Sequence, residues 1–201
     1  MDGKNNMDLK SLEEEVKKCR KCSLWEKRKN VVFGEGDTSS KLMFIGEAPG
    51  YHEDQQGRPF VGAAGKLLTE LIESLDLKRE NVYIANVLKC RPPNNRDPNP
   101  EEIQACYPWL EKQIEIINPR IICTLGRYSA YVLLKTSINM SSYHGKSFEI
   151  DNRIIFVTYH PAAALYHGKI LEEIRKDFSN LKKIILEMKE ENTKTEQLSF
   201  W

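Results

Sequence analysis

Glu47, Asn86 and His160 each stand at or just after the end of a short apolar run. A carboxylate can orient water, an amide can read the hydrogen-bonding edge of a base, and an imidazole can donate to a developing anion. If the runs are parallel strands, their carboxyl ends meet at one edge of a sheet, where ligands gather. The three residues therefore predict a pocket for a polar base. Taken singly, a strand-end asparagine is more often a turn former, and a histidine before proline is ordinarily a loop residue.

A glycine-rich segment, residues 46–65, follows the first of these runs. It holds five glycines and two prolines and leads into a helical pattern. Such a segment lets backbone N–H groups approach a ligand closely. It matches neither a P-loop, because Leu67 follows Gly65-Lys66, nor a dinucleotide-binding glycine pattern. It predicts one wall of a pocket, and a plain strand-to-helix connection is the alternative.

Four of the five cysteines have a spacing that suits a metal site. Cys19 and Cys22 form a C-x-x-C pair, and fifteen residues separate Cys90 from Cys106. Four thiolates can hold a tetrahedral zinc ion or a [4Fe–4S] cluster, and the spacing alone slightly favours zinc. Four unrelated thiols are the alternative. Cys123 lies within an apolar run and is interpreted as a small buried hydrophobe.

Apolar runs and helical patterns alternate along the chain. Because the strand runs are continuously apolar, both faces of their sheet must be covered. We therefore expect an α/β fold, a three-layer sandwich whose central, mainly parallel, four-stranded sheet carries helices on both faces. The expected strands are 42–45, 82–88, 120–125 and 153–158, and the expected helices include 8–19, 66–76, 99–119 and 169–190, with 136–150 a loop holding at most one short strand.

Length and composition indicate one ordinary globular domain. The chain has 201 residues, 40% hydrophobic and 29% charged. We expect the domain at 1–192 and a flexible C-terminal tail at 193–201. No run is long enough to cross a bilayer, and the first residues lack the features of a secretory signal, so a cytoplasmic location is expected. The net charge of +1 neither supports nor excludes DNA binding.

Four motifs in this order resemble the family 4 uracil-DNA glycosylases, the thermostable iron–sulfur type found in many bacteria and archaea. The resemblance covers roughly residues 15–185. Its motifs are GEAPG at 46–50, GRPFVG at 57–62, NVLKCRPP at 86–93 and HPAAAL at 160–165. It implies a DNA repair glycosylase that hydrolyses the N-glycosidic bond of uracil in DNA, releases free uracil and leaves an abasic site. Uracil-containing DNA, single- or double-stranded, is the implied partner.

The resemblance also assigns the metal site. It implies a [4Fe–4S] cluster on Cys19, Cys22, Cys90 and Cys106 in place of zinc. A structural cluster suits the sequence, because hydrolysis needs no electron transfer and the cluster would pin the N-terminal segment and the Pro-rich loop.

For the substrate, the resemblance implies a division of labour. Phe60 is the platform under the flipped ring, with a core aromatic as the alternative. Asn86 reads uracil, and His160 donates to its O2 atom, which the backbone N–H groups of Glu47 and Ala48 could also serve. The expected substrate-binding residues are Gly46, Glu47, Ala48, Glu53, Phe60, Asn86 and His160, of which Glu47, Asn86 and His160 are the expected catalytic residues.

Glu47 is the residue expected to hold the nucleophilic water. Ala48 occupies the position where some other uracil glycosylase families have an aspartate. Glu47 matches the residue characteristic of family 4 and could orient water or stabilise the cationic sugar. Glu53 and Asp54 are alternatives, and Glu53 could instead be the wall that excludes the methyl group of thymine.

DNA contacts are expected around the same edge. Leu165 is the candidate wedge that fills the space left by the flipped nucleotide. Any single cation is as often a solvated surface charge. The candidate cations are Arg58, Lys66, Arg91 and Arg127, and beside them Lys89, Arg96 and Lys169.

The C-terminal residues 197–201 resemble a truncated sliding-clamp-binding motif without its full spacing, and the chain is expected to be a monomer. Two other functions are alternatives. One is a relative with an altered base range, or one that traps the abasic sugar covalently, although the basic insertion with its histidine is missing from 91–98. The other is a metal-stabilised nucleic-acid-binding protein, or the phage polymerase-associated relative, without glycosylase activity.

Overall fold

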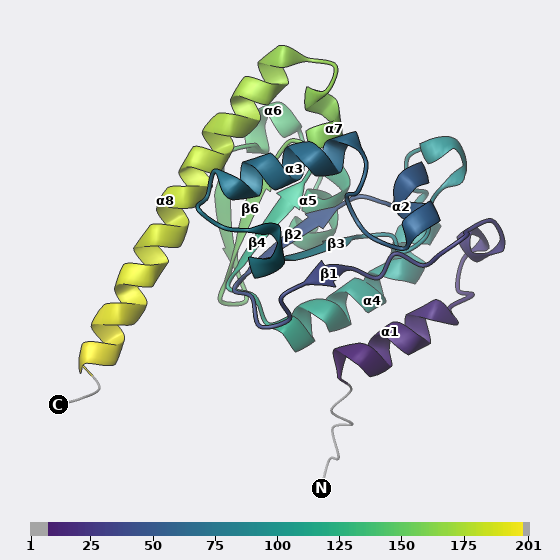
Figure 1. The fold of residues 1–201 in the computed structure, drawn as a ribbon, viewed down its shortest axis with the longest axis horizontal. Helices are drawn as coiled ribbons and strands as arrows, with labels where there is room; N and C mark the ends of the chain where they lie inside the picture. Colours follow the sequence, from purple (N-terminus) through teal and green to yellow (C-terminus); the bar gives the residue numbers. More distant parts are fainter. Residues whose placement is uncertain (1–7, 199–201) are drawn as a thin grey trace, which may run out of the picture.

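The computed structural model describes residues 8–198, with side chains described up to residue 188. Helices and strands alternate along the chain as expected (Figure 1). The helices are α1 (Leu9–Lys17), α2 (Tyr51–Gln56), α3 (Ala63–Glu73), α4 (Pro100–Ile117), α5 (Arg127–Leu134), α6 (Met140–Tyr143), α7 (Pro161–Ala164) and α8 (Gly168–Leu198). The strands are β1 (Glu35–Gly36), β2 (Leu42–Gly46), β3 (Tyr83–Asn86), β4 (Ile121–Leu125), β5 (Ser147–Ile150) and β6 (Arg153–Thr158), and short 3-10 helices lie at Ser23–Glu26, Arg79–Asn81 and Pro93–Asn95.

Over residues 8–198, the sheet has six strands in the order β1-β3-β2-β4-β6-β5. The four central strands are parallel and correspond to the four predicted strands. The two edge strands are antiparallel, so the prediction of a four-stranded sheet is wrong in number. β1 is two residues long and contains a glycine, which leaves no alternating pattern to detect. β5 exposes every second residue, as a half-covered edge strand does.

Helices cover both faces of the sheet, which confirms the three-layer sandwich. Successive side chains of a strand point to opposite faces. Leu42 and Phe44 of β2 pack in the cluster that includes α3 and α8, whereas Met43 and Ile45 pack in the cluster that includes α1, α4 and α5. Both clusters are buried, which explains why the strands read as continuous apolar runs.

The chain ends differ from the expected boundaries. The helix α8 continues to Leu198 rather than ending near Glu190, so residues 193–198 of the expected tail are helical. The helix α1 ends at Lys17, two residues before the first cysteine of the predicted metal site. Phe200 and Trp201, on which the clamp-binding prediction depends, lie outside the described residues. Within residues 8–198, no helix is both long and apolar enough to cross a bilayer.

The helix α8 also fixes the end of β6. Asp177 on α8 is 2% exposed, and its Oδ2 accepts a hydrogen bond from the hydroxyl of Thr158 at 2.7 Å. Its Oδ1 lies 3.1 Å from Nδ1 of His144. Thr158 is the last residue of β6, two residues before His160. The position of the predicted catalytic histidine is therefore tied to a helix on one face of the sheet.

Candidate active site

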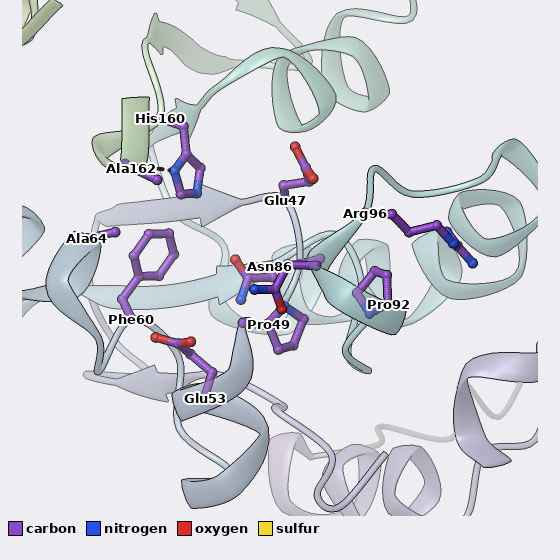
Figure 2. Close-up of a pocket in the computed structure, with 13 residues that line it drawn as sticks. Glu47, Pro49, Glu53, Phe60, Ala64, Asn86, Pro92, Arg96, His160 and Ala162 are labelled. Atoms are coloured by element: carbon purple, nitrogen blue, oxygen red, sulfur yellow. Dashed lines mark hydrogen bonds between the residues drawn. The ribbon is translucent and has the colours of Figure 1, made fainter. Parts of the chain in front are cut away.

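A cavity of about 360 Å³ opens at the carboxyl ends of the parallel strands. Phe60, Asn86 and His160 all line it, although they come from a loop, the end of β3 and the start of α7. Figure 2 shows these side chains arranged around a common space. Of the expected substrate-binding residues, Glu47, Ala48 and Glu53 line the same cavity. The structure thus brings together the expected substrate-binding residues except Gly46, which does not line the cavity.

Asn86 presents an acceptor with no partner. It is 1% exposed, and its Oδ1 is buried and has no hydrogen-bond partner among the described residues. A buried unpaired acceptor costs about 1–3 kcal/mol, so a ligand N–H at this position recovers that free energy. Gly46 explains why the amide fits here, because a Cβ atom at Gly46 would overlap both Asn86 Oδ1 and the Phe60 ring. Gly46 therefore acts by leaving space for its neighbours.

His160 is held as a neutral imidazole. It caps the N-terminus of α7, where its Nδ1 accepts a hydrogen bond from the backbone N–H of Ala162 at 3.1 Å. Because Nδ1 accepts, the ring proton is on Nε2, which leaves Nε2–H as a donor. Burial lowers the pKa of His160 to about 4, and the charge of Glu53 opposes this shift. At neutral pH the residue is a donor without a charge.

Phe60 is fixed in an unusual backbone conformation. Its φ angle is 51°, in the left-handed region that bulky residues rarely adopt. Its ring is 7% exposed and stacks on the His160 ring, with 5.5 Å between centroids and 25° between planes. The guanidinium of Arg79 donates to the carbonyl oxygen of Pro59 at 2.6 Å, directly before Phe60. The ring is thus a rigid wall of the cavity.

Two other carboxylates of the loop have structural partners. Glu53 Oε1 accepts from the backbone N–H groups of Val61 and Gly62 at 2.9 and 3.0 Å, so it holds the turn that follows Phe60. Asp54 is 4% exposed, does not line the cavity, and accepts from the N–H of Lys29 at 2.9 Å. The alternative prediction that Asp54 holds the nucleophilic water is therefore wrong, because its carboxylate is buried away from the cavity.

Glu47 is the carboxylate with freedom to act in the cavity. It is half-buried, and among the described residues it forms no ion pair and no side-chain hydrogen bond. Burial is the main cause that raises the pKa of Glu47 to about 7. The charge of Asp97 raises it further and the charge of Arg127 lowers it. A pKa matched to neutral pH suits a group that exchanges protons with water.

The candidate DNA-binding residues lie in different settings. Arg58 is committed to an ion pair with Glu35, with 2.7 Å between Nε and Oε2. Arg127 pairs with Asp97 at 3.2 Å, and Arg91 lies over the ring of Tyr51.

Lys66 is exposed on α3, and Leu165 after α7 is 42% exposed. These assignments stay predictions.

The prediction that Lys89 contacts a DNA phosphate is wrong. Its side chain is 1% exposed, so it cannot reach a DNA phosphate. Arg96 lines the cavity but forms a bidentate pair with Glu102. The structure also adds lining residues that were not among the predicted site residues, although four of them lie inside the motifs, namely Pro49, Gly50, Pro92 and Ala162, and beside these Ala64 and Asn95. The Pro-rich segment after β3 was the available signal for two of them.

The four cysteines Cys19, Cys22, Cys90 and Cys106 line a single second pocket beside α4. Three N–H groups point at their sulfur atoms. The indole N–H of Trp109 donates to Cys19, a guanidinium N–H of Arg28 to Cys90 and the backbone N–H of Lys89 to Cys106, each at 3.3 Å. Such donors stabilise negatively charged sulfur. Cys123 packs on the other face of the sheet, which confirms that it is a buried hydrophobe.

The four cysteines do not form a ready single-ion site in the part of the chain that the structure describes. Four thiolates around one zinc ion lie about 2.3 Å from the metal. Within the part of the chain that the structure describes, no three His, Cys, Asp or Glu side chains are close enough to hold one ion. A metal group on these four cysteines therefore stays a prediction.

Comparison with known proteins gives the family. Residues 33–187 match the sequence model of the uracil DNA glycosylase superfamily. The chain is 51% identical to the type-4 uracil-DNA glycosylase of Sulfurisphaera tokodaii over 187 residues, which cover 89% of this chain and 85% of the relative. It is 51% identical to that of Saccharolobus solfataricus, over 90% of this chain and 87% of the relative. It is 45% identical to that of Archaeoglobus fulgidus, over 86% and 91%.

The match extends through every element that forms the cavity, from β2 to the start of α8. Its length and identity far exceed what a shared glycine loop or a shared α/β topology would give. The chain therefore belongs to the uracil DNA glycosylase superfamily and, within it, to the type-4 uracil-DNA glycosylases.

Proposed function

We propose that this protein is a uracil-DNA glycosylase, a hydrolase that cleaves the N-glycosidic bond of uracil in DNA and starts base excision repair of deaminated cytosine. It releases free uracil and leaves an abasic site. The observation that carries the proposal is the convergence of Phe60, Asn86 and His160 on one cavity. Membership in the type-4 family supports the same reaction.

Asn86 distinguishes uracil from cytosine. Its buried Oδ1 accepts from N3–H of uracil, and its amide nitrogen donates to O4. Cytosine has an acceptor at N3 and an amino group at C4, so both contacts would be mismatched. The Oδ1 atom has no hydrogen-bond partner in the free protein. With cytosine bound it would still have none, so the free-energy cost of burying this acceptor would remain. Discrimination therefore comes mainly from the penalty against cytosine.

The base reaches this cavity by leaving the DNA stack. Flipping costs a few kcal/mol, less for a mispaired uracil than for a paired base. Stacking on the fixed ring of Phe60 returns roughly 1–3 kcal/mol. The exposed Leu165, just after α7, fills the space that the nucleotide leaves. Arg58, Lys66, Arg91 and Arg127 supply phosphate contacts around it.

His160 stabilises uracil as it departs. Cleavage of the glycosidic bond places negative charge on uracil O2 and positive charge on the sugar. The Nε2–H of a neutral His160 donates to O2, and the cap bond from Ala162 fixes the ring for this task. A preorganised donor at developing charge is worth about 2.7–4 kcal/mol. Glu47 and Ala48 line the same cavity, and their backbone N–H groups assist.

Glu47 completes the reaction on the sugar side. Its carboxylate accepts a proton from the attacking water, or holds that water against the cationic sugar carbon. The pKa of Glu47 near 7 keeps a large fraction deprotonated at neutral pH. Glu53 shapes the cavity and holds the turn after Phe60.

The proposal includes a [4Fe–4S] cluster held by Cys19, Cys22, Cys90 and Cys106. The residues present fit such a group, because four thiols line one pocket and three N–H groups point at three of the sulfurs. When bound, the cluster supplies structure, since hydrolysis of a glycosidic bond transfers no electrons. The thiolates join the segment after α1, the loop after β3 and the helix α4.

DNA with uracil in a single or double strand is the proposed partner, and the protein acts inside the cell as a monomer. A sliding clamp as a second partner depends on the last residues of the chain. Pull-down with a clamp before and after deletion of residues 194–201 tests this, and equal recovery would end the idea.

The reaction is tested with a labelled oligonucleotide that carries one uracil. Incubation, alkali treatment and gel analysis reveal an abasic site, and chromatography reveals free uracil. The wild-type protein is expected to cut this strand and to leave matched oligonucleotides with thymine or cytosine intact. Asn86→Asp and His160→Ala should each lower single-turnover release by about 100-fold or more, with unchanged circular dichroism. Wild-type rates in both variants would show that the pocket is wrongly assigned.

A further inference from the structure

Lys89 is a lysine in the interior of the protein. Its side chain is 1% exposed. Its ammonium donates to the backbone carbonyl oxygen of Asn86 at 2.9 Å and to the side-chain oxygen of Gln113. Its own backbone N–H donates to Cys106 Sγ at 3.3 Å. One residue thus touches both the base-reading asparagine and a cysteine of the second pocket.

No carboxylate of the described residues lies within ion-pair distance of the Lys89 ammonium. Among the ion pairs of the described residues, none includes Lys89. The groups around it are neutral oxygens and the sulfur atoms of Cys106 and Cys90, whose charge acts on it when they are thiolates. Burial of an ammonium without a charged partner costs free energy. A lysine in the core is therefore expected to make a specific contact that offsets this cost.

One of the two contacts of the ammonium, the hydrogen bond to the backbone carbonyl oxygen of Asn86, reaches a residue that lines the cavity. Asn86 is the last residue of β3, and the backbone N–H groups of Val87 and Leu88 after it donate to the carbonyl oxygens of Gly46 and Glu47, each at 3.0 Å. Its side-chain oxygen makes no hydrogen bond in the structure, so the side chain has no polar anchor through that atom. The orientation of the amide therefore depends on its backbone and on the atoms packed around it. The ammonium of Lys89 reaches back three residues and fixes the backbone carbonyl.

Gln113 fixes the ammonium in turn. Its side-chain nitrogen donates to the backbone oxygen of Phe33 at 3.0 Å and to the hydroxyl of Tyr83 at 3.3 Å. Gln113 is fully buried on α4, the helix that also carries Cys106. The network therefore runs from α4 through Lys89 to the end of β3.

We propose that Lys89 is a positioning residue for uracil recognition, which holds Asn86 in place from the interior and links it to the cysteine-lined pocket. This inference rests on the proposed function of the cavity. Lys89 does not line the cavity and touches no substrate. Its effect on the reaction passes through Asn86, because a displacement of about 1 Å in a recognition group can lower a rate by 100-fold.

The test begins with Lys89→Met, which removes the ammonium and keeps most of the apolar stem. We expect a 10- to 100-fold lower single-turnover rate of uracil release. Lys183→Met is the matched control, since Lys183 is an exposed lysine on α8 and its removal changes the net charge equally. We expect that control to stay within twofold of the wild type. Circular dichroism and the ratio of iron to protein are measured for each variant and should match the wild type.

A double-mutant cycle separates positioning from a general structural effect. In an Asn86→Ala background there is no amide left to position. Lys89→Met should then lower the residual rate by less than threefold. An equal fold loss in both backgrounds would overturn the proposal, and so would a loss of iron in proportion to activity. Both results would mean that Lys89 acts through the fold or the cysteine pocket.

A second variant keeps the test decisive if Lys89→Met does not fold. Gln113→Leu retains the lysine and removes one of its two acceptors, so a 3- to 10-fold loss is expected, again absent in the Asn86→Ala background. An additive loss overturns the proposal. If the wild type releases no uracil, the proposed function itself is wrong. If the wild type and Lys89→Met release uracil at the same rate, only the role of Lys89 is wrong.

Discussion

At the scale of single residues, Glu47 and His160 show how burial changes the chemistry of ordinary side chains. Both face one cavity, and burial is the largest cause of the pKa shift of each. It raises the pKa of the carboxyl to about 7 and lowers that of the imidazole to about 4. The charged form of each group is disfavoured, since water no longer solvates it fully. At pH 7 the histidine is a neutral donor and the glutamate a weak base.

The pH dependence of uracil release follows from these values. If Glu47 activates water, the single-turnover rate should rise with pH through about 7 and then level off, as the carboxylate forms. His160 should add no inflection between pH 5 and 9, because it is already neutral there. Glu47→Gln should lower the rate at pH 8 and abolish the rising limb. A Glu47→Gln profile that still rises near pH 7 would exclude Glu47 as the titrating group.

The raised pKa of Glu47 should also make the folded protein less stable as pH rises, whereas the reaction rate should increase. The folded-state pKa of Glu47 lies above its ordinary value of 4.5, which means that the folded protein favours the protonated carboxyl. The contribution of Glu47 to the free energy of unfolding is therefore fully present below about pH 4.5 and is lost as pH rises through about 7. Glu47→Gln should therefore be more stable than the wild type at pH 8, by about 1–2 kcal/mol after allowance for partial exposure. Urea unfolding at pH 5 and pH 8 measures the difference, which should be smaller at pH 5.

At the scale of elements, the loop between β2 and α3 is fixed by close backbone approach. Gly65, in the first turn of α3, lies against the backbone of Phe60, and a Cβ atom there would overlap the carbonyl group of Phe60. Glu53 holds the same turn from α2. The unusual φ angle of Phe60 therefore persists because contacts from two helices determine it.

Gly65→Ala tests this arrangement. The methyl group would force Phe60 or α3 to move, at roughly 1–3 kcal/mol of folding free energy, as overpacked sites show. We expect a lower unfolding midpoint and at least a tenfold lower rate of uracil release. Gly168→Ala at the start of α8 is the matched control, because no atom lies within 4 Å of the added Cβ. Equal effects of the two substitutions would contradict the role of close packing at Gly65.

At the scale of the whole molecule, the cysteine-lined pocket joins segments that are distant in the sequence. Cys19 and Cys22 follow α1, Cys90 follows β3 and Cys106 lies in α4. Without ligand bonds, α1 is attached to the rest of the domain mainly by packing against α4 through residues such as Leu12 and Val16. A group bound by all four thiols would cross-link these segments and stabilise the folded state.

Cys106→Ala should therefore release iron, abolish the visible absorption of the purified protein and lower its thermal unfolding midpoint. Several kcal/mol of folding free energy are at stake when a structural metal group is lost. Cys123→Ala is the control, since that thiol is buried on the other face of the sheet. It should retain the iron and the absorption. Iron analysis, the absorption spectrum and thermal unfolding give the answer. Equal iron content in the two variants would rule out Cys106 as a ligand.

Much of the architecture could be predicted from local patterns. The runs around Phe44, Ile122 and Phe156 are apolar without interruption because helices cover both faces of the sheet, and this identified the four central strands. The edge strand Glu35–Gly36 escaped prediction, and Ser147–Ile150 was expected only as one short strand somewhere within 136–150. Both strands are stabilised by their neighbours and carry little pattern of their own. The motifs placed Phe60, Asn86 and His160 in one pocket, and the cavity contains all three.

The sequence by itself determined which chemical groups stand at the strand ends, their order along the chain and the family. These properties are written in residue types and spacing. Only the tertiary structure decided that Lys89 is buried behind Asn86, that Asp54 supports a loop, and that His160 carries its proton on Nε2. The physical reason is that burial, hydrogen-bond partners and pKa depend on what packs against a side chain, and those atoms come from distant segments. The same carboxyl or amine therefore acquires its role only when the chain is folded.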